Sequence, residues 1–315
     1  MFLICGEALF DLFGEAGVDD GLSFDARIGG SPFNVAVGLA RLGESAGFFG
    51  GISNDMLGEK LVQKFRQEGV SERYILRTDY LTTLSLVQKD GHGHPAYTFY
   101  GANAADRMVS ESDLPEFTEP PLFLHVGSYT ALVDPIATAL KALITRERER
   151  TLISFDPNIR PTVVSDMERW RTNTETLVPL TDVIKVSDED LALIAPGEAI
   201  ADMARAWLDL GAKLIIVTKG GDGASAYAPG IEIHCPGVKV DVEDTVGAGD
   251  TFQAALLAGL KQLGVSSRKE LAALDEDRLN RLLGFAISAA AITCSRRGAD
   301  LPRLSELEKE WSALK

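Results

Sequence analysis

Short apolar runs alternate along the chain with stretches in which apolar residues recur every three or four positions. The runs, bounded by turn-forming residues, lie at 1–5, 122–126, 151–155, 182–186 and 213–217. The stretches with helical spacing lie at 34–42, 56–67, 135–148, 200–210 and 251–263. Runs of this length are typical of buried strands, and their alternation with helices is typical of βαβ units. The pattern predicts an α/β fold with a doubly wound, mostly parallel sheet.

Two stretches, 9–28 and 82–100, lack helical spacing and alternate polar with apolar residues around turns, the second turn at 88–91. Each predicts a hairpin that leaves and re-enters the main sheet. We therefore expect a small discontinuous β lid. A small sheet with one apolar face needs a partner, either substrate or a second subunit. The expected division is a core of 1–8, 31–80 and 108–315 and a lid of 9–30 and 81–107.

Composition narrows the class of protein. The chain has 315 residues, 45% of them hydrophobic, with a formal charge of −15 and three cysteines. The acidic balance argues against nucleic acid, because affinity for the phosphate backbone comes from clustered Lys and Arg. The longest apolar stretch, 285–294, is shorter than the ~20 residues of a membrane span, and no signal-peptide pattern opens the chain. We expect a cytoplasmic protein that binds neither nucleic acid nor membrane.

The strongest chemical signal is the sequence DTVGAGDT at 244–251. The small residues Gly247, Ala248 and Gly249 let backbone N–H groups converge at the start of a predicted helix, which makes an anion site. A carboxylate at an anion site repels phosphate, so its presence there suggests a functional role. Asp250 is therefore a candidate base that takes the proton of a hydroxyl attacking a phosphoryl group. The alternative is an aspartate that caps the helix.

A second glycine-rich turn, GGSPFN at 29–34, precedes another predicted helix. Gly29 and Gly30 permit close approach of the backbone to a ligand, and the Asn34 amide offers a donor and an acceptor. With a carboxylate such as Asp11, this set can bind the vicinal hydroxyls of a sugar. A turn with a helix cap is the alternative. The segment 50–58 repeats the glycine-rich strand-to-helix pattern.

Two common nucleotide motifs are missing from the sequence. It contains no GxxxxGK[ST] loop and no convincing dinucleotide fingerprint, so Walker-type ATPases and NAD enzymes are not expected. The segment 218–223, TKGGDG, follows a predicted strand. By itself it is equally typical of a hairpin turn.

Taken together and in this order, the motifs resemble the ribokinase-like, or phosphofructokinase B, family of carbohydrate kinases. The segments 29–36 and 244–250 are similar to its two signatures, and 155–161 and 185–190 also match, so the resemblance covers essentially the whole chain. The opening GEALFD at 6–11 is most similar to bacterial fructokinases within the family. The resemblance implies a doubly wound core, a β lid that often forms a homodimer clasp, and transfer of the ATP γ-phosphate to a sugar hydroxyl.

The resemblance also implies a role for each matching position. Asp250 would be the catalytic base, and Gly247, Ala248 and Gly249 the anion hole. The sugar would be held by Asp11, Gly29, Gly30, Asn34 and Arg160. The nucleotide would lie near Lys185, Thr218, Gly220 and Gly223. A monovalent cation such as K⁺ would use the Asp244 carboxylate and the Val246 carbonyl, with carbonyls around Arg296 and Gly298 as weaker candidates.

One departure concerns magnesium. Many relatives carry an Asn-x-x-Glu motif linked to Mg²⁺, whereas this chain has Ser187-Asp188-Glu189-Asp190. This places Asp190 in the outer shell of the ion. Mg²⁺ is still needed to neutralise the ATP phosphates, held mainly by ATP and water.

Three other functions stay open. A 2-keto-3-deoxygluconate kinase would need positive charge, which Arg160 can supply, but Gly101 follows Tyr100 where many such kinases carry arginine. A nucleoside kinase would stack a base on lid aromatics such as Phe24, Tyr97 or Phe99. A non-catalytic sugar-binding protein of the same fold is the third, and retention of Asp250 speaks against it.

Overall fold

The computed structural model describes residues 1–15, 21–89 and 95–314. Its large sheet contains β1 (Phe2–Cys5), β4 (Ala46–Ser53), β5 (Ile75–Thr78), β8 (Phe123–Gly127), β9 (Leu152–Asp156), β10 (Val183–Ser187), β11 (Leu214–Thr218), β12 (Ala224–Ala228) and β13 (Ile231–Cys235). These nine strands run in the order β13-β12-β11-β10-β9-β8-β1-β4-β5. All neighbours pair in parallel except the hairpin strands at one edge, β11 with β12 and β12 with β13. The fold is α/β with a mostly parallel sheet, as the pattern predicts.

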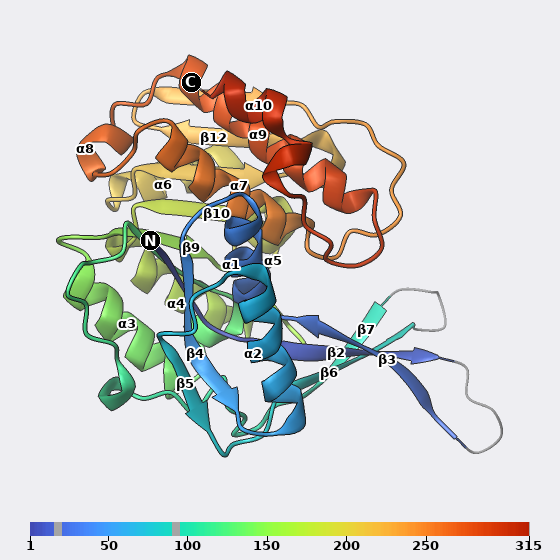
Figure 1. Cartoon of the computed structure of the whole chain (residues 1–315). Helices are drawn as coiled ribbons and strands as arrows, with labels where there is room; N and C mark the ends of the chain where they lie inside the picture. Colours follow the sequence, from blue (N-terminus) through green and yellow to red (C-terminus); the bar gives the residue numbers. More distant parts are fainter. Residues whose placement is uncertain (16–20, 90–94, 315) are drawn as a thin grey trace.

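Helices cover both faces of this sheet (Figure 1). They are α1 (Ser31–Arg41), α2 (Met56–Glu68), α3 (Ile136–Glu147), α4 (Met167–Leu177), α5 (Asp188–Ile194), α6 (Ile200–Asp209), α7 (Ala248–Gln262), α8 (Arg268–Leu271), α9 (Glu276–Cys294) and α10 (Glu308–Ala313). The predicted strands and helices are confirmed, with ends that shift by no more than one helical turn. Among the described helices, none combines the length and apolarity needed to cross a bilayer.

Alternation along the strands sends successive side chains to opposite faces, which produces two apolar cores. In β1, Phe2 and Ile4 join the core beneath α1, α2, α7 and α9. Leu3 and Cys5 join the core beneath α3, α4 and α6. Such burial on both faces explains why the strands read as continuous apolar runs. The sheet is therefore a rigid base for the loops at its carboxyl-terminal edge.

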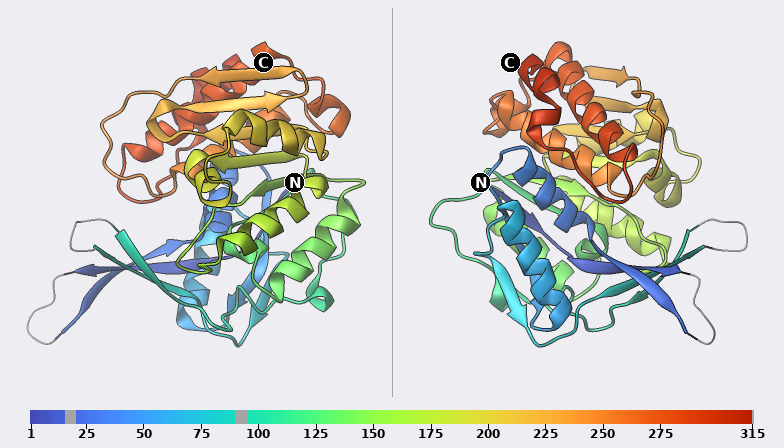
Figure 2. Two further views of the ribbon diagram at one scale, coloured as in Figure 1. Left: turned by 180° about the vertical axis from the view of Figure 1, so that it is seen from behind. Right: turned by 45° about the vertical axis from the view of Figure 1, so that its right-hand side comes forward.

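A second sheet projects from the core in every view (Figures 1 and 2). It consists of β2 (Leu9–Glu15), β3 (Ser23–Gly29), β6 (Leu84–Lys89) and β7 (Pro95–Tyr100), in the order β3-β2-β6-β7. Two antiparallel hairpins join through a parallel pairing of β2 with β6. The predicted discontinuous sheet is thus present. The expected turn at 88–91 lies partly outside the described residues, and the bounds of the lid as a domain stay a prediction.

Candidate active site

The two glycine-rich motifs meet in space where α1 and α7 begin. Asp250, in the first turn of α7, accepts a hydrogen bond from the Ser31 hydroxyl at 2.6 Å. Its second oxygen accepts one from the Asn34 side-chain amide at 2.7 Å. Both donors belong to the first turn of α1. The candidate base is therefore held by the helix that carries the candidate sugar-binding motif.

The structure excludes the simpler interpretation of Asp250 as a helix cap. Gly247 is the N-cap residue of α7, and no side chain caps this helix. The Asp250 carboxylate instead bonds across to α1. Asn34 likewise donates its side-chain N–H to Asp250, and the N-cap of α1 is Gly30. Neither polar side chain caps its own helix, so helix capping explains the position of neither residue.

The environment of Asp250 favours a base. The residue is half-buried. Burial raises the pKa of its carboxyl, while the hydrogen bonds from Ser31 and Asn34 and the charges of Lys185 and Arg160 oppose the rise. A carboxylate with a raised pKa accepts a proton more readily than an exposed one.

The turn before α7 exposes backbone amides. Gly247 has φ +79°, and a Cβ there would lie 2.6 Å from the Ala299 Cβ, so the turn requires glycine. Within the described part of the chain, the N–H groups of Gly247, Gly249 and Asp250 make no hydrogen bond. The Ala248 N–H donates to the Thr245 carbonyl at 3.2 Å. An anion at this helix start would find free amides on either side of Ala248.

Asp244 ties this turn to the loop that follows α9. Its two oxygens accept hydrogen bonds from the Val246 N–H at 3.1 Å and from the Gly298 N–H at 2.8 Å. The residues expected around a monovalent cation are therefore neighbours. A carboxylate and backbone carbonyls are hard oxygen donors of the kind that K⁺ takes, and the cation site stays a prediction.

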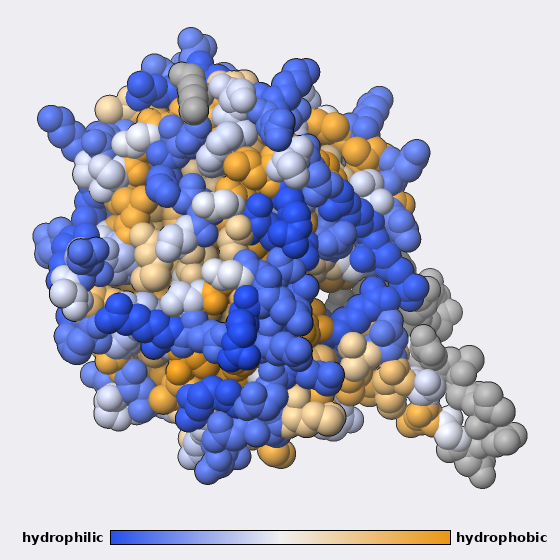
Figure 3. All heavy atoms as spheres, viewed as in Figure 1, coloured by the Kyte–Doolittle hydropathy of each residue, from blue (hydrophilic) through white to orange (hydrophobic). Residues whose placement is uncertain are grey.

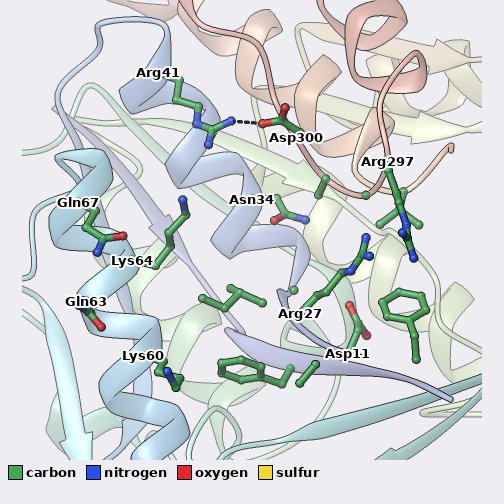
Figure 4. Close-up of a pocket in the computed structure, with 18 residues that line it drawn as sticks. Asp11, Arg27, Asn34, Arg41, Lys60, Gln63, Lys64, Gln67, Arg297 and Asp300 are labelled. Carbon is green, nitrogen blue, oxygen red and sulfur yellow. Dashed lines mark hydrogen bonds and ion pairs between the residues drawn. The ribbon is translucent and has the colours of Figure 1, made fainter. Parts of the chain in front are cut away.

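The expected sugar-binding residues line the base of the lid. A Cβ on Gly29 would lie 2.2 Å from an Asp11 carboxylate oxygen, so the missing side chain makes room for this carboxylate. Burial raises the pKa of Asp11, and the charge of Asp250 adds to the rise while that of Arg160 opposes it. Asp11, Gly29 and Asn34 share a cavity of about 520 Å³ (Figure 4). Asp11 and Asn34 are thus placed to contact one ligand.

Lys185 and Asp156 form a buried ion pair beneath the amide turn. Their Nζ and Oδ2 atoms are 2.9 Å apart, and the two side chains are 5% and 2% exposed. Burial lowers the pKa of Lys185, but the charge and hydrogen bond of Asp156 outweigh burial, so the pKa of Lys185 is raised. The Nζ atom lies 3.2 Å from where a Gly249 Cβ would be. A fixed positive charge therefore lies directly under the turn.

Asp190 lies beside this pair, in the first turn of α5. Ser187 is the N-cap of α5 and accepts a hydrogen bond from the Asp190 N–H at 2.9 Å. The Asp190 carboxylate accepts one from the Ile159 N–H at 3.1 Å. Burial and the charge of Asp156 raise its pKa. In the described part of the chain, no cluster of three or more His, Cys, Asp or Glu residues is built to hold a metal. The Asp190 carboxylate is a hard oxygen donor of the kind that Mg²⁺ prefers, and its role near the ion stays a prediction.

Thr218, Gly220 and Gly223 belong to the hairpin between β11 and β12. Thr218 ends β11, and the Lys219 N–H closes the turn on the Gly223 carbonyl at 2.8 Å. A Cβ on Gly223, where φ is +98°, would lie 2.1 Å from the Cys235 carbonyl oxygen. The hairpin is confirmed, and its turn follows the carboxyl end of β11, next to the ends of β9 and β10. Ligands of open α/β sheets bind at this edge.

Sequence reasoning missed several polar partners of the site. Ser31 received no role, although it lies inside the motif, and the Asp156 carboxylate was overlooked. A charged residue that ends an apolar strand, as Asp156 does in LISFD, was the available signal. His125, Ser154 and Gln253 form a buried polar group under α7, with Gln253 Nε2 donating to Ser154 Oγ at 2.8 Å. Nothing in the pattern of Gln253 indicated a partner 99 positions away.

Known proteins are similar to this chain over most of its length. The family model of the pfkB family carbohydrate kinases matches residues 3–306. A fructokinase of Rhizobium leguminosarum bv. trifolii is 37% identical over 279 residues, which cover 89% of this chain and 85% of that protein. A fructokinase of Escherichia coli is 32% identical over 316 residues, 98% of each chain.

Solved structures are similar over the full length. A fructokinase from Xylella fastidiosa with bound ATP has a TM-score of 0.89 and 27% identity, and the match covers 99% of this chain and 98% of that one. A fructokinase from Vibrio cholerae O395, in its fructose, ADP and calcium ion bound form, has a TM-score of 0.82 and 28% identity, covering 100% and 98%.

Proposed function

Because the chain belongs to the pfkB family of carbohydrate kinases, we propose that it is a fructokinase, which transfers the γ-phosphate of ATP to a hydroxyl of fructose. One observation carries the proposal. The Asp250 carboxylate is held by Ser31 and Asn34 at the start of α7, next to free backbone amides and to the cavity that contains Asp11. A base, an anion site and a polar cavity at one point are the parts that phosphoryl transfer to a sugar requires.

In the proposed reaction the sugar hydroxyl oxygen bonds to the γ-phosphorus as the bond from phosphorus to the β,γ-bridging oxygen breaks. Asp250 accepts the hydroxyl proton, and ADP leaves with the electron pair of the broken bond. The N–H groups at Gly247, Gly249 and Asp250 stabilise the negative charge on the phosphoryl oxygens. The raised pKa of Asp250 suits it to take the proton as the new bond forms.

The sugar site is proposed to consist of Asp11, Gly29, Gly30, Asn34 and Arg160. Asn34 orients the base with its amide nitrogen. This leaves its carbonyl oxygen to accept a hydrogen bond from a sugar hydroxyl. The Asp11 carboxylate can accept from two neighbouring hydroxyls. The lid strands lie over this site, so closure would exclude water, which competes with the sugar for the phosphoryl group.

The nucleotide site is proposed to lie at the carboxyl edge of the sheet, with Lys185, Thr218, Gly220 and Gly223 near ATP. Lys185 acts through its charge under the turn, because it is buried and paired with Asp156. Asp190 would hold Mg²⁺ through water, and Asp244 with the Val246 carbonyl would hold K⁺. These ions neutralise the phosphates of the bound nucleotide.

We also propose a cytoplasmic homodimer that joins through the lid. Three apolar lid residues, Leu22, Phe24 and Tyr100, are exposed by 81%, 38% and 62%. Burying such side chains against a second copy would be favourable. The free state of Cys5, Cys235 and Cys294 is that expected in a reducing compartment.

An ATP-consumption assay over a panel of acceptors tests the proposed function. The panel contains fructose, other hexoses, 2-keto-3-deoxygluconate and nucleosides, with Asp250→Asn as the control for contaminating kinases. We expect the largest kcat/KM with fructose. A larger value with 2-keto-3-deoxygluconate would assign Arg160 to a substrate carboxylate, and one with a nucleoside would assign the lid to a base. No consumption with any acceptor would leave a sugar-binding protein.

A further inference from the structure

The orientation of the lid is set where its strands leave and re-enter the core, because the lid projects from the body of the molecule (Figure 3). Asp11 belongs to β2 of the lid, whereas Asn34 belongs to α1 of the core. Both can contact one sugar only while the lid keeps a fixed angle to the core. The contacts at the base of the lid therefore affect the proposed sugar site.

A buried polar cluster lies at this base, and we call Thr83, Asp106 and Tyr129 the hinge cluster. Thr83 directly precedes β6, Asp106 lies in the segment that returns from β7 to the core, and Tyr129 follows β8 of the large sheet. One Asp106 oxygen accepts a hydrogen bond from the Thr83 hydroxyl, and the other accepts one from the Tyr129 hydroxyl at 2.6 Å. The three residues are at most 1% exposed. Asp106 therefore joins both ends of the second lid hairpin to the core.

The hinge cluster requires a carboxylate at position 106. Both hydroxyls donate to it, so each of its oxygens acts as an acceptor. Burial raises the pKa of Asp106, whereas the hydrogen bonds from Thr83 and Tyr129 and the charge of Arg107 favour its ionised form. An asparagine has one side-chain oxygen in place of two, so it cannot reproduce both contacts.

Tyr129 is fixed between the lid and the core. Its ring meets that of Phe99 in β7 edge to face, with the centroids 6.0 Å apart, and the Arg107 guanidinium lies 5.0 Å from its centroid. A Cβ on Gly101, which follows β7, would lie 2.9 Å from Thr83 Oγ1 and 3.1 Å from Arg107 Nη2. The end of β7 therefore packs closely against the hinge cluster, which leaves the lid little freedom to change its angle.

The backbone of Thr83 continues this link to the proposed sugar site. Its carbonyl accepts a hydrogen bond at 3.2 Å from the N–H of Phe10, the residue before Asp11. Two positions after Thr83, Ser85 pairs with Asp11 across the parallel strands β6 and β2. Asp106 thus holds, through Thr83, the strand against which the Asp11 backbone lies.

We propose that Asp106 is a positioning residue for sugar binding, which acts through Thr83 to keep the Asp11 carboxylate where it and Asn34 contact one sugar. The identity of the sugar rests on the proposed function, whereas the link from Asp106 to Asp11 rests on the contacts of the lid base. Without this link the binding-competent orientation of the lid becomes rarer, and the apparent affinity for sugar falls by the same factor. Asp250 is held by α1 of the core, so phosphoryl transfer from the bound state is largely kept.

Titration of the full chain with fructose, without nucleotide, tests this proposal together with kcat and KM. The variants are Asp106→Asn, Thr83→Val, the conservative Thr83→Ser, and the control Thr181→Val. Thr181 is also a buried threonine, and it donates its hydroxyl to the Leu177 carbonyl at 2.9 Å, just before the amino end of β10. We expect Asp106→Asn and Thr83→Val to raise the Kd and KM of fructose about tenfold, the loss of one hydrogen bond to a charged group, with kcat largely kept. Thr83→Ser and Thr181→Val should bind fructose like the wild type.

Amide hydrogen exchange reports separately on the lid. Exchange over β2 and β6 should be faster in Asp106→Asn and Thr83→Val than in the wild type and Thr181→Val. If both hinge-cluster variants bind fructose as tightly as the wild type, whatever their exchange, or if Thr181→Val weakens binding equally, the proposal is wrong. Thermal melting shows which variants fold, and Thr83→Val with Thr83→Ser is sufficient if Asp106→Asn does not.

Failure of the kinase proposal would appear separately, as absence of ATP consumption by the wild type in the acceptor panel. If another acceptor has the largest kcat/KM, that acceptor replaces fructose in the titrations, and the expected changes are the same.

Discussion

Asn34 of α1 donates its side-chain amide to the Asp250 carboxylate of α7 at 2.7 Å, although 216 positions of sequence separate them. The hydrogen bond joins the candidate sugar-binding motif to the candidate base. Whatever moves α1 therefore reorients the group proposed to take the proton.

Replacement of the base by asparagine removes the proton acceptor but keeps the size of the side chain. For Asp250→Asn we expect kcat to fall by at least ~10²-fold, the contribution typical of a positioned base. Binding of fructose, measured by titration without ATP, should stay within a few-fold of the wild type. Near-normal turnover in this variant would remove Asp250 from the proposed role.

The Ser31 hydroxyl stabilises the ionised form of Asp250 at 2.6 Å. Without this hydrogen bond the pKa of Asp250, already raised by burial, rises further. The base must be ionised, so Ser31→Ala should move the acid limb of the kcat profile to higher pH. Ser31→Thr keeps a hydroxyl and should leave the limb in place. An acid limb shared by all three proteins would mean that another group limits turnover.

Gly247 and Gly69 allow a matched comparison, because both have φ +79°. A Cβ on Gly69 meets no atom within 4 Å, whereas one on Gly247 lies 2.6 Å from the Ala299 Cβ. Gly69→Ala should lower the free energy of unfolding by about 1 kcal/mol, the backbone cost alone. Gly247→Ala should cost about 1–3 kcal/mol more through crowding, and kcat should fall with it. Equal losses in urea denaturation would contradict the crowded turn.

Glu7 is a buried carboxyl, 2% exposed, that accepts a hydrogen bond from Thr130 at 3.0 Å. Burial raises its pKa from 4.5 to about 7. The folded protein therefore binds this proton more tightly than the unfolded chain. Its stability should decrease as the pH rises from 4.5 to about 7, by up to about 3 kcal/mol.

Glu7→Gln cannot ionise and should lose this decrease. The measurement is the free energy of unfolding of both proteins at several values of pH across that range. The difference between the two curves isolates Glu7 from the other buried carboxyls, such as Asp106. Parallel curves would show that Glu7 titrates at an ordinary pKa.

The sequence predicted those parts of the fold in which periodicity and burial agree. Strands such as β10 are apolar throughout because both faces are covered, and α1 and α7 have a clear apolar side. β4 was not predicted, because Gly50 and Gly51 interrupt its apolar residues and were interpreted as a turn. The structure places both inside the strand, where a Cβ on Gly51 would lie 1.9 Å from the Ala105 carbonyl oxygen. Their role is close packing against a distant segment, which local patterning does not contain.

The candidate site was predictable to the extent that each motif is local. The turn before Asp250 and the turn before Asn34 could each be interpreted as an anion or sugar site from their small residues. Tertiary packing brings the two turns together. It also forms the ion pair of Lys185 with Asp156 and places Arg27 beside Gly298. Ala248 also departs from the predicted anion hole, because its N–H already has the Thr245 carbonyl as acceptor.

The split of the site between α1 and α7 has a consequence for biosynthesis. A nascent chain that has emerged only as far as β11 already contains Asp11 and Asn34, yet it lacks Asp250, the proposed base, and the amide turn before α7. In the proposed mechanism, catalysis begins only once the last quarter of the polypeptide has left the ribosome and α7 has docked on α1. We therefore expect fragments truncated before that point to transfer no phosphoryl group from ATP.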